Sequence, residues 1–301
     1  MVECIGLRAA LSLADRLPLR AVTALAGSAG SLWYGLDVAR RRTACENIRR
    51  SGIAATEAEI RRIARASFRH FGILAVESLK ASAAIRADNW RDFVQMDIPK
   101  SSFDLLAAPG QGLILVSGHL GNWEVAAQIV SFLKPVVGVT RRMNNPHTEA
   151  IIHERKERDR FVLTPKHDAD AFRFISALRS GHVLALLIDQ HARTRGMMIP
   201  FLGTPASAHT SPALLHLVTR APLCFGYCLR TGPLNYRFVA TEPIVVKPTG
   251  NREADVRLIL ERLTRELEAA IRSAPDQYVW AHRRWRAPTQ RASPDASLAA
   301  R

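Results

Sequence analysis

Residues 112–124 have the sequence GLILVSGHLGNWE, and this stretch decides the fold. Four consecutive apolar residues, 113–116, lie between Gly112 and Gly118, a pattern typical of a strand that is buried on both faces. Helical periodicity then covers residues 123–133. The stretch therefore predicts a strand, a short loop rich in glycine and a helix. Ligands of α/β sheets bind at the carboxyl ends of strands, so this loop is the first place to look for a site.

Strand and helix patterns alternate along the rest of the chain, which favours an α/β fold with a central, mostly parallel sheet flanked by helices. A capping-box pattern, Thr56 with Glu59, starts a helix that continues to residue 86. Further strands are expected at 93–98, 136–140, 183–188, 223–229, 236–241 and 244–246, and further helices at 146–158, 170–180, 212–219 and 253–271. We expect three segments: a helical membrane-associating region at 1–50, the α/β domain at 51–288 and a flexible tail at 289–301.

The N-terminal region suggests attachment to a membrane surface. Residues 21–36 carry no charge, but 16 residues are fewer than the about 20 that a spanning helix needs. Trp33 and Tyr34 are residue types that favour the membrane–water boundary, and arginines follow at 40–42. The alternatives are a buried helix pair and a true span. Charged residues interrupt the first 20 positions, so a secretory signal is not expected.

The overall charge points to a partner rich in phosphate. The 301 residues include 42 Lys and Arg against 27 Asp and Glu, a net charge of +15, and 36 of the basic residues are Arg. Arg binds such groups in a bidentate way, but a GC-rich coding bias would also raise its share. Anionic lipid, an acidic carrier protein and nucleic acid all fit the charge. The aromatic residues are not interleaved with Arg as in single-strand binders, so nucleic acid is not expected.

Several chemistries have no motif behind them. The sequence contains no G-x-S-x-G, no phosphate-binding G-x-x-x-x-G-K-[ST], no G-x-G-x-x-G and no H-E-x-x-H. The ten histidines show no metal-ligand spacing, so we expect no metal. Four cysteines show no C-x-x-C pair, which favours reduced, buried thiols in a chain that is intracellular or faces the cytosol. They are Cys4, Cys45, Cys224 and Cys228.

His119 and Glu124 are the candidate catalytic pair. Inside one helix, residues five apart face different directions, but a loop His can converge with a Glu in the first helical turn. A carboxylate on one imidazole nitrogen fixes the tautomer, and the other nitrogen can then take a proton from a hydroxyl. The free N–H groups of the helix start could bind an oxyanion. The alternative is a capped helix start with an incidental histidine.

The stretch from Gly118 to Glu124 resembles the H-x4-D/E motif of glycerolipid and lipid A acyltransferases. Its G-H-x-G-N-W-E sequence is similar to that of the bacterial late lipid A acyltransferases, the lauroyl/myristoyl transferases of the lysophospholipid acyltransferase superfamily. Other segments agree in order with the same family. They are L-P-L-R at 17–20, Arg141 with Asn145-Pro146, Asp189-Gln190, P-F-L-G at 200–203 through Thr210, and Q-Y-V-W-A-H-R-R-W at 277–285.

The resemblance implies an acyl-carrier-protein-dependent O-acyltransferase that moves a fatty acyl chain to a hydroxyl of a lipid A precursor. The resemblance also implies that the enzyme acts at the cytoplasmic face of the inner membrane. The thioester is already activated, so no cofactor is expected. His119 is the expected base and Glu124 its orienting partner. Acceptor or donor binding is expected from Asn122, Arg141, Asn145, Arg155, Arg158, Asp189, Gln190, Arg195 and Thr210.

Simpler roles remain open for some of these residues. Arg155 and Arg158 could lie on a solvated helix face, while Asp189 and Thr210 could be helix caps. Two other functions are also compatible with the sequence. One is acylation of another membrane lipid, such as a phosphoinositol mannoside or an amino-acid lipid. The other is a non-catalytic basic protein that binds membrane or nucleic acid.

Overall fold

The structure is a computed structural model, and it describes residues 17–140, 161–165, 171–193 and 196–285. Its strands are β1 (Val94–Asp97), β2 (Leu113–Ser117), β3 (Val136–Thr140), β4 (Phe161–Pro165), β5 (Val183–Leu187), β6 (Gly196–Phe201), β7 (Thr204–His209), β8 (Leu223–Gly232) and β9 (Asn235–Ala240). Its α-helices are α2 (Leu19–Leu36), α3 (Val38–Ser51), α4 (Glu57–Ala84), α5 (Lys100–Ala107), α6 (Trp123–Leu133), α8 (Ala171–Arg179), α9 (Ser211–Thr219) and α10 (Arg252–Ser273). Short 3-10 turns lie at Trp90–Asp92 and at η2 (Pro275–Gln277).

A seven-stranded sheet of order β1-β9-β8-β2-β5-β3-β4 forms the centre of the described part. All neighbouring strands in it run parallel except β8 and β9, which form an antiparallel hairpin. β2 lies in the middle, with Leu115 opposite Ala185 of β5 and Cys224 of β8. The expected mostly parallel α/β sheet is therefore confirmed. His119 follows the carboxyl end of β2, and at that end β2 has a parallel neighbour on each side, β5 and β8.

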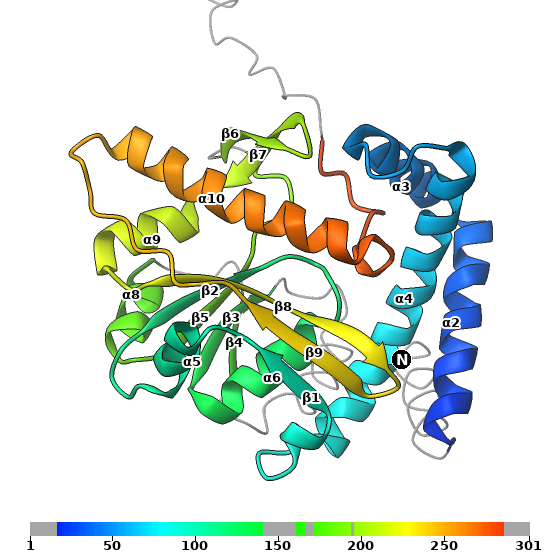
Figure 1. Cartoon of the computed structure of the whole chain (residues 1–301), viewed down its shortest axis with the longest axis horizontal. Coiled ribbons are helices and arrows are strands. Elements are labelled where there is room, and N and C mark those ends of the chain that lie inside the picture. Colours follow the sequence, from blue (N-terminus) through cyan, green and yellow to red (C-terminus); the bar gives the residue numbers. More distant parts are fainter. Residues whose placement is uncertain (1–16, 141–160, 166–170, 194–195, 286–301) are drawn as a thin grey trace, which may run out of the picture.

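Both faces of the sheet are covered by helices, so β2 alternates between two apolar layers. Ile114 and Val116 join a cluster that includes residues of α9 and α10. Leu113 and Leu115 join a second cluster that includes residues of α5 and α6. Figure 1 shows α9 and α10 on one side of the sheet and α5 and α6 on the other. This double burial explains why the run 113–116 has no polar residue.

The N-terminal helices α2 and α4 lie side by side at one end of the sheet (Figure 1). A Cβ at Gly30 would lie 2.3 Å from the Phe68 carbonyl oxygen, and one at Gly72 would lie 2.4 Å from that of Ala26. Glycine is thus required for this close approach. The described helices include none whose length and apolarity suffice for crossing a bilayer. The capping box at Thr56 and Glu59 is present as expected.

Some sequence expectations differ from the structure. The hairpin β6–β7, strand β4 and helix α5 were not expected. The expected strand at 244–246 is wrong, because only Ile244 forms an isolated bridge, to Leu223. The expected helix at 146–158 and the tail at 289–301 lie outside the described residues, and the boundary at residue 50 stays a prediction. Ala44 and Ile48 of α3 belong to the same apolar cluster as Ile114, so the buried core continues across residue 50.

Candidate active site

The loop after β2 is held in place by backbone bonds on two sides. Gly121 donates its N–H to the Gln277 carbonyl oxygen at 3.0 Å, and Asn122 donates to that of Cys228 at 2.7 Å. Gly121 has φ of +61°, and a Cβ there would lie 2.0 Å from the Cys228 carbonyl oxygen. A residue with a side chain would therefore meet both backbone strain and a collision. The loop that carries His119 consequently has little freedom to move.

His119 forms a two-point contact with Asp189, which lies two residues beyond the end of β5. The imidazole Nδ1 is 2.8 Å from Asp189 Oδ1, and the His119 backbone N–H donates to Asp189 Oδ2 at 2.9 Å. The Asp189 side chain is fully buried, whereas the His119 side chain is 20% exposed. An ionised carboxylate can only accept hydrogen bonds, so Nδ1 must carry the hydrogen of this bond. In the neutral imidazole, Nε2 is then the basic nitrogen. The histidine is thus set up to take a proton at Nε2.

The electrostatics of the pair favour an imidazolium beside a carboxylate. Burial lowers the pKa of His119, but the charge of Asp189 and its hydrogen bond outweigh this, so the net pKa is raised. Burial raises the pKa of Asp189, but the charge and hydrogen bond of His119 hold it well below its usual range. Asp189 therefore stays ionised, and it stabilises the charged form of His119 that exists after proton transfer.

The segment 277–285 packs behind this pair. His282 Nε2 lies 3.1 Å from the Asp189 carbonyl oxygen and 3.4 Å from the Tyr278 hydroxyl. The pKa of Tyr278 lies well above its ordinary value. Burial is the main cause, and the charge of Asp189 and a hydrogen bond to that residue add to it. The buried Arg284 donates to the carbonyl oxygens of Gln190 and Ser207 at 3.2 and 2.6 Å. These contacts hold the backbone of Asp189 and of the following residue, Gln190.

Glu124 is the partner that the sequence predicted for His119. It lies in the first turn of α6 and is partly buried. His119 Nδ1 donates its hydrogen bond to Asp189, while Glu124 acts on His119 through its charge, which helps raise the pKa of that histidine. Trp123 lies beside the imidazole, with ring centroids 5.0 Å apart in an edge-to-face arrangement. The sequence singled out His119, but it paired this histidine with Glu124 and gave Asp189 only an expected role in substrate binding.

Three other expected site residues lie in the described part, namely Asn122, Gln190 and Thr210. Asn122 is buried, and its side-chain oxygen caps α6 by accepting from the Val125 N–H at 3.1 Å. The amides of Gly121, Asn122 and Val125 all donate within the protein, so these three do not form an oxyanion site. Gln190 is exposed, and Thr210 occupies the N-cap position of α9 without a side-chain cap bond. The expected residues outside the described part are Arg141, Asn145, Arg155, Arg158 and Arg195.

The cysteines in the described part are reduced. Cys224 and Cys228 lie four apart on β8 and are both buried, as the sequence predicted. Burial raises the pKa of the Cys224 thiol to about 11 and raises that of Cys228 further. A thiol attacks as its thiolate, so these two are poor nucleophiles at neutral pH.

The fold and the pair together define an α/β protein with a histidine, held by a buried carboxylate, at the carboxyl end of a central parallel strand. Residues 5–287 match the family described as bacterial lipid A biosynthesis acyltransferase. The chain belongs to this family, and it is therefore an acyltransferase of the lipid A biosynthesis type. The family expected from the sequence is thereby confirmed.

Individual relatives agree with this assignment at low identity. The chain is 23% identical over 225 residues to the lipid A biosynthesis palmitoleoyltransferase of Escherichia coli, covering 73% of this chain and 70% of that one. It is 22% identical over 204 residues to the lipid A biosynthesis lauroyltransferase of the same organism, covering 67% and 63%. Among solved structures, the 1-acyl-sn-glycerophosphate acyltransferase of Thermotoga maritima matches with a TM-score of 0.36, 12% identity and coverage of 82% and 97%.

Proposed function

We propose that this chain transfers a fatty acyl group from an acyl-carrier-protein thioester to a hydroxyl of a lipid A precursor, with His119 as the general base. The observation that carries the proposal is the 2.8 Å contact between His119 Nδ1 and the buried Asp189, which leaves Nε2 as the basic nitrogen. Family membership supports the acyl transfer. The net charge of +15 supports docking of an acidic carrier protein through electrostatic steering.

The proposed reaction is a direct transfer. His119 Nε2 takes the proton of the acceptor hydroxyl while its oxygen attacks the thioester carbonyl carbon. The tetrahedral intermediate expels the carrier thiolate, which receives that proton from the imidazolium, so an ester and a thiol result. Asp189 stays ionised throughout and balances the imidazolium charge. Glu124, whose charge also raises the pKa of His119, favours the same charged form.

No covalent nucleophile is needed in this scheme. The buried thiols of Cys224 and Cys228 have raised pKa values and are unsuited to attack. The simplest route is therefore a complex of enzyme, donor and acceptor. An acyl-enzyme trapped with donor alone would contradict this route.

The test is mass spectrometry of membrane glycolipids from host cells that lack this chain. We expect lipid A to lose one acyl chain, and wild type to restore it. His119→Ala should not restore it, because no base would accept the hydroxyl proton. The matched control is His182→Ala, which lies next to Val183 at the amino end of β5, opposite to the carboxyl end where His119 lies. It should restore the chain in full.

Other outcomes would redirect the assignment. Loss of a chain from a phosphoinositol mannoside or an amino-acid lipid, with lipid A unchanged, would name a different acceptor for the same site. Full rescue by His119→Ala would contradict the catalytic role of this histidine. If no lipid changes, and the protein binds membrane or DNA equally well with His119→Ala, a non-catalytic binding role would be favoured.

We also propose that α2 attaches the enzyme to the cytoplasmic face of the inner membrane. Its outer face carries Leu25, Leu32 and Leu36, which are 60%, 63% and 73% exposed, and residues 21–36 include no charge. The exposed Arg40 and Arg42 follow at one end. An apolar face beside arginines suits an anionic bilayer surface.

Trp33 and Tyr34, the expected boundary residues, pack against Phe68 of α4 in the structure. Their rings lie 4.8 and 5.5 Å from the ring of Phe68, centroid to centroid. They therefore contribute to the packing between α2 and α4. Under the proposal, the leucines make the apolar contact with lipid and the arginines make the charged one.

Leu32→Glu should weaken binding to vesicles of anionic lipid at least about tenfold. The reason is that burial of one leucine contributes about 1.5–3 kcal/mol, and the new carboxylate is repelled by the surface. Sedimentation with vesicles measures the effect. The control is Leu258→Glu on α10, which is also an exposed leucine, at 38%. Equal binding of both variants and wild type would exclude α2 as the contact.

A further inference from the structure

A stripe of buried polar side chains runs along the face of α4 that meets the catalytic loops. Ser67, His70 and Glu77 are separated by three and seven positions, so they share one face of the helix. All three are buried. A helix face in a protein core is normally apolar, and polar groups there need partners. Their hydrogen-bond partners lie in the His119 loop itself, at residue 121, and in two other segments, at 230–236 and at 278.

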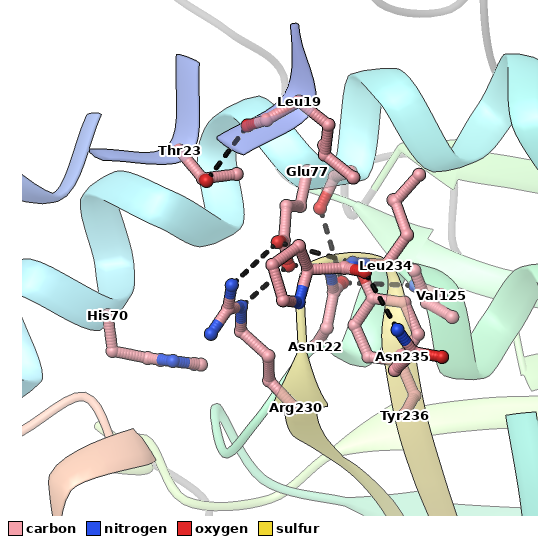
Figure 2. Close-up of polar contacts among 12 residues, drawn as sticks. Leu19, Thr23, His70, Glu77, Asn122, Val125, Arg230, Leu234, Asn235 and Tyr236 are labelled. Atoms are coloured by element: carbon pink, nitrogen blue, oxygen red, sulfur yellow. Dashed lines mark hydrogen bonds and ion pairs between the residues drawn. The ribbon is translucent and has the colours of Figure 1, made fainter. Parts of the chain in front are cut away.

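Glu77 is the most heavily bonded member of the stripe. Arg230 donates to it twice, from Nε to Oε2 at 2.9 Å and from Nη2 to Oε1 at 3.0 Å. The Tyr236 hydroxyl donates to Oε2 at 3.1 Å, and the Leu234 N–H donates to Oε1 at 3.4 Å. Figure 2 shows these groups converging on the carboxylate from the hairpin β8–β9. The carboxylate thus fastens α4 to this hairpin.

Tyr236 extends the network to the catalytic loop. Its hydroxyl accepts from Asn122 Nδ2 at 3.5 Å, and Asn122 Oδ1 accepts from the Ser78 hydroxyl at 3.2 Å. The same Oδ1 caps the start of α6. Asn122 lies three positions after His119, so the chain from Glu77 through Tyr236 reaches the loop of the base (Figure 2).

Three side chains of α3 and α4 contact backbone carbonyl oxygens of residues 121 and 278–282. His70 Nε2 lies 3.1 Å from the Gly121 carbonyl oxygen. The Ser67 hydroxyl donates to the Tyr278 carbonyl oxygen. Asn47 Nδ2 donates to the carbonyl oxygens of Trp280 and His282, at 2.8 Å each. The N-terminal helices α3 and α4 therefore hold the His119 loop and residues 278–282 from one side.

We infer that Glu77 and Tyr236 are positioning residues for His119, acting through Asn122. The inference rests on the proposed role of His119 as the base. Loss of the Tyr236 hydroxyl removes the acceptor for Asn122 Nδ2 and one donor to Glu77, while the Arg230 pair is kept. The α6 cap then loosens, and the loop shifts relative to Asp189. Displacements of about 1 Å at a reacting group lower rates strongly, so the effect falls on kcat.

The experiment compares Tyr236→Phe with wild type in the full chain. We expect kcat to fall about tenfold, with KM for the acyl donor changed less than about twofold. Amide hydrogen exchange measured by mass spectrometry should be faster in peptides that cover residues 119–126. The matched control is Thr249→Val, which also removes a hydroxyl donor to a buried carboxylate, Asp255, at 2.8 Å. It should lower Tm to a similar extent with no change in kcat or in exchange at 119–126.

Each outcome decides the inference. Wild-type kcat and exchange in Tyr236→Phe would overturn it, and so would an equal loss of kcat in Thr249→Val. If Tyr236→Phe does not fold, Ser78→Ala replaces it, because it removes the other side-chain contact of Asn122; wild-type kcat there would equally overturn the positioning role. If wild type itself transfers no acyl group, the proposed function fails, and the exchange measurement still tests whether Tyr236 orders the loop.

Discussion

Asp189→Asn should lower kcat by about 10³- to 10⁴-fold, with KM changed little. Both carboxylate oxygens of Asp189 face His119, one toward Nδ1 and one toward the backbone N–H. An amide has almost the same shape, but it carries no charge and can accept through one atom only. The imidazole then adopts the wrong tautomer and loses its counter-charge, which in histidine-based catalysis costs about four orders of magnitude. Steady-state kinetics with purified donor and acceptor measure the effect.

The same variant should move the pH profile in a defined direction. The base must be neutral to accept a proton, so kcat/KM rises with pH through the pKa of His119. Burial lowers this pKa and Asp189 raises it above the ordinary value of about 6.5. Without the aspartate charge the burial effect remains, so the acid limb should shift to lower pH. A limb that stays in place would mean that another group titrates.

Glu124→Gln is the matched comparison, since it is also a carboxylate-to-amide change beside the same imidazole. We expect a smaller loss of kcat, because Glu124 acts on His119 by charge while Asp189 holds Nδ1. A loss equal to that of Asp189→Asn would instead favour the H-x4-E pairing that the sequence suggested.

Gly121→Ala should destabilise the protein by more than about 3 kcal/mol and abolish activity. The left-handed φ alone costs a residue with a Cβ about 1–2 kcal/mol. In addition, the new Cβ would lie 2.0 Å from the Cys228 carbonyl oxygen, so the loop and β8 would have to separate. That separation would break the 2.7 Å bond from the Asn122 N–H to the same oxygen. Urea unfolding measures the stability, and activity is assayed at a temperature where the variant stays folded.

Gly52→Ala is the control for the free-energy cost of the left-handed backbone conformation alone. Gly52 has φ of +64°, yet a Cβ there meets no atom within 4 Å. It should cost about 1–2 kcal/mol and leave activity unchanged. Equal losses in the two variants would mean that the close approach of β8 adds nothing.

Periodicity predicted the buried central elements well. The run 113–116 and the helix 123–133 were found almost to the residue, because a doubly covered strand is continuously apolar and α6 keeps a regular apolar face. The hairpin β6–β7 escaped because its turn is formed by Leu202 and Gly203, both with positive φ. Leucine is a rare residue at such a position, so the usual Asn-Gly or Asp-Gly signal is missing.

The candidate site was only partly predictable, for a physical reason. His119 was identified because strand, loop and helix are contiguous in sequence, but its partner Asp189 lies 70 positions away, after β5. Only the pairing of β2 with β5 brings them together. Glu77 could have been noticed in the sequence, because it is an acidic residue within the periodic buried face of α4. Nothing in the local sequence pointed to its partners Arg230 and Tyr236.

The bonds from α3 and α4 to the closing segment have a consequence for the order of assembly. Asn47 and Trp280 are separated by 233 positions, and Ser67 and Tyr278 by 211. Contacts of such long range form late, because the entropy of closing the intervening loop is lost before they add stability. In a growing chain His119 emerges before Cys228 and Gln277, whose carbonyl oxygens accept from the amides of its loop. We therefore expect the bonds between the N-terminal helices and residues 278–282 to complete the surroundings of His119 late in folding.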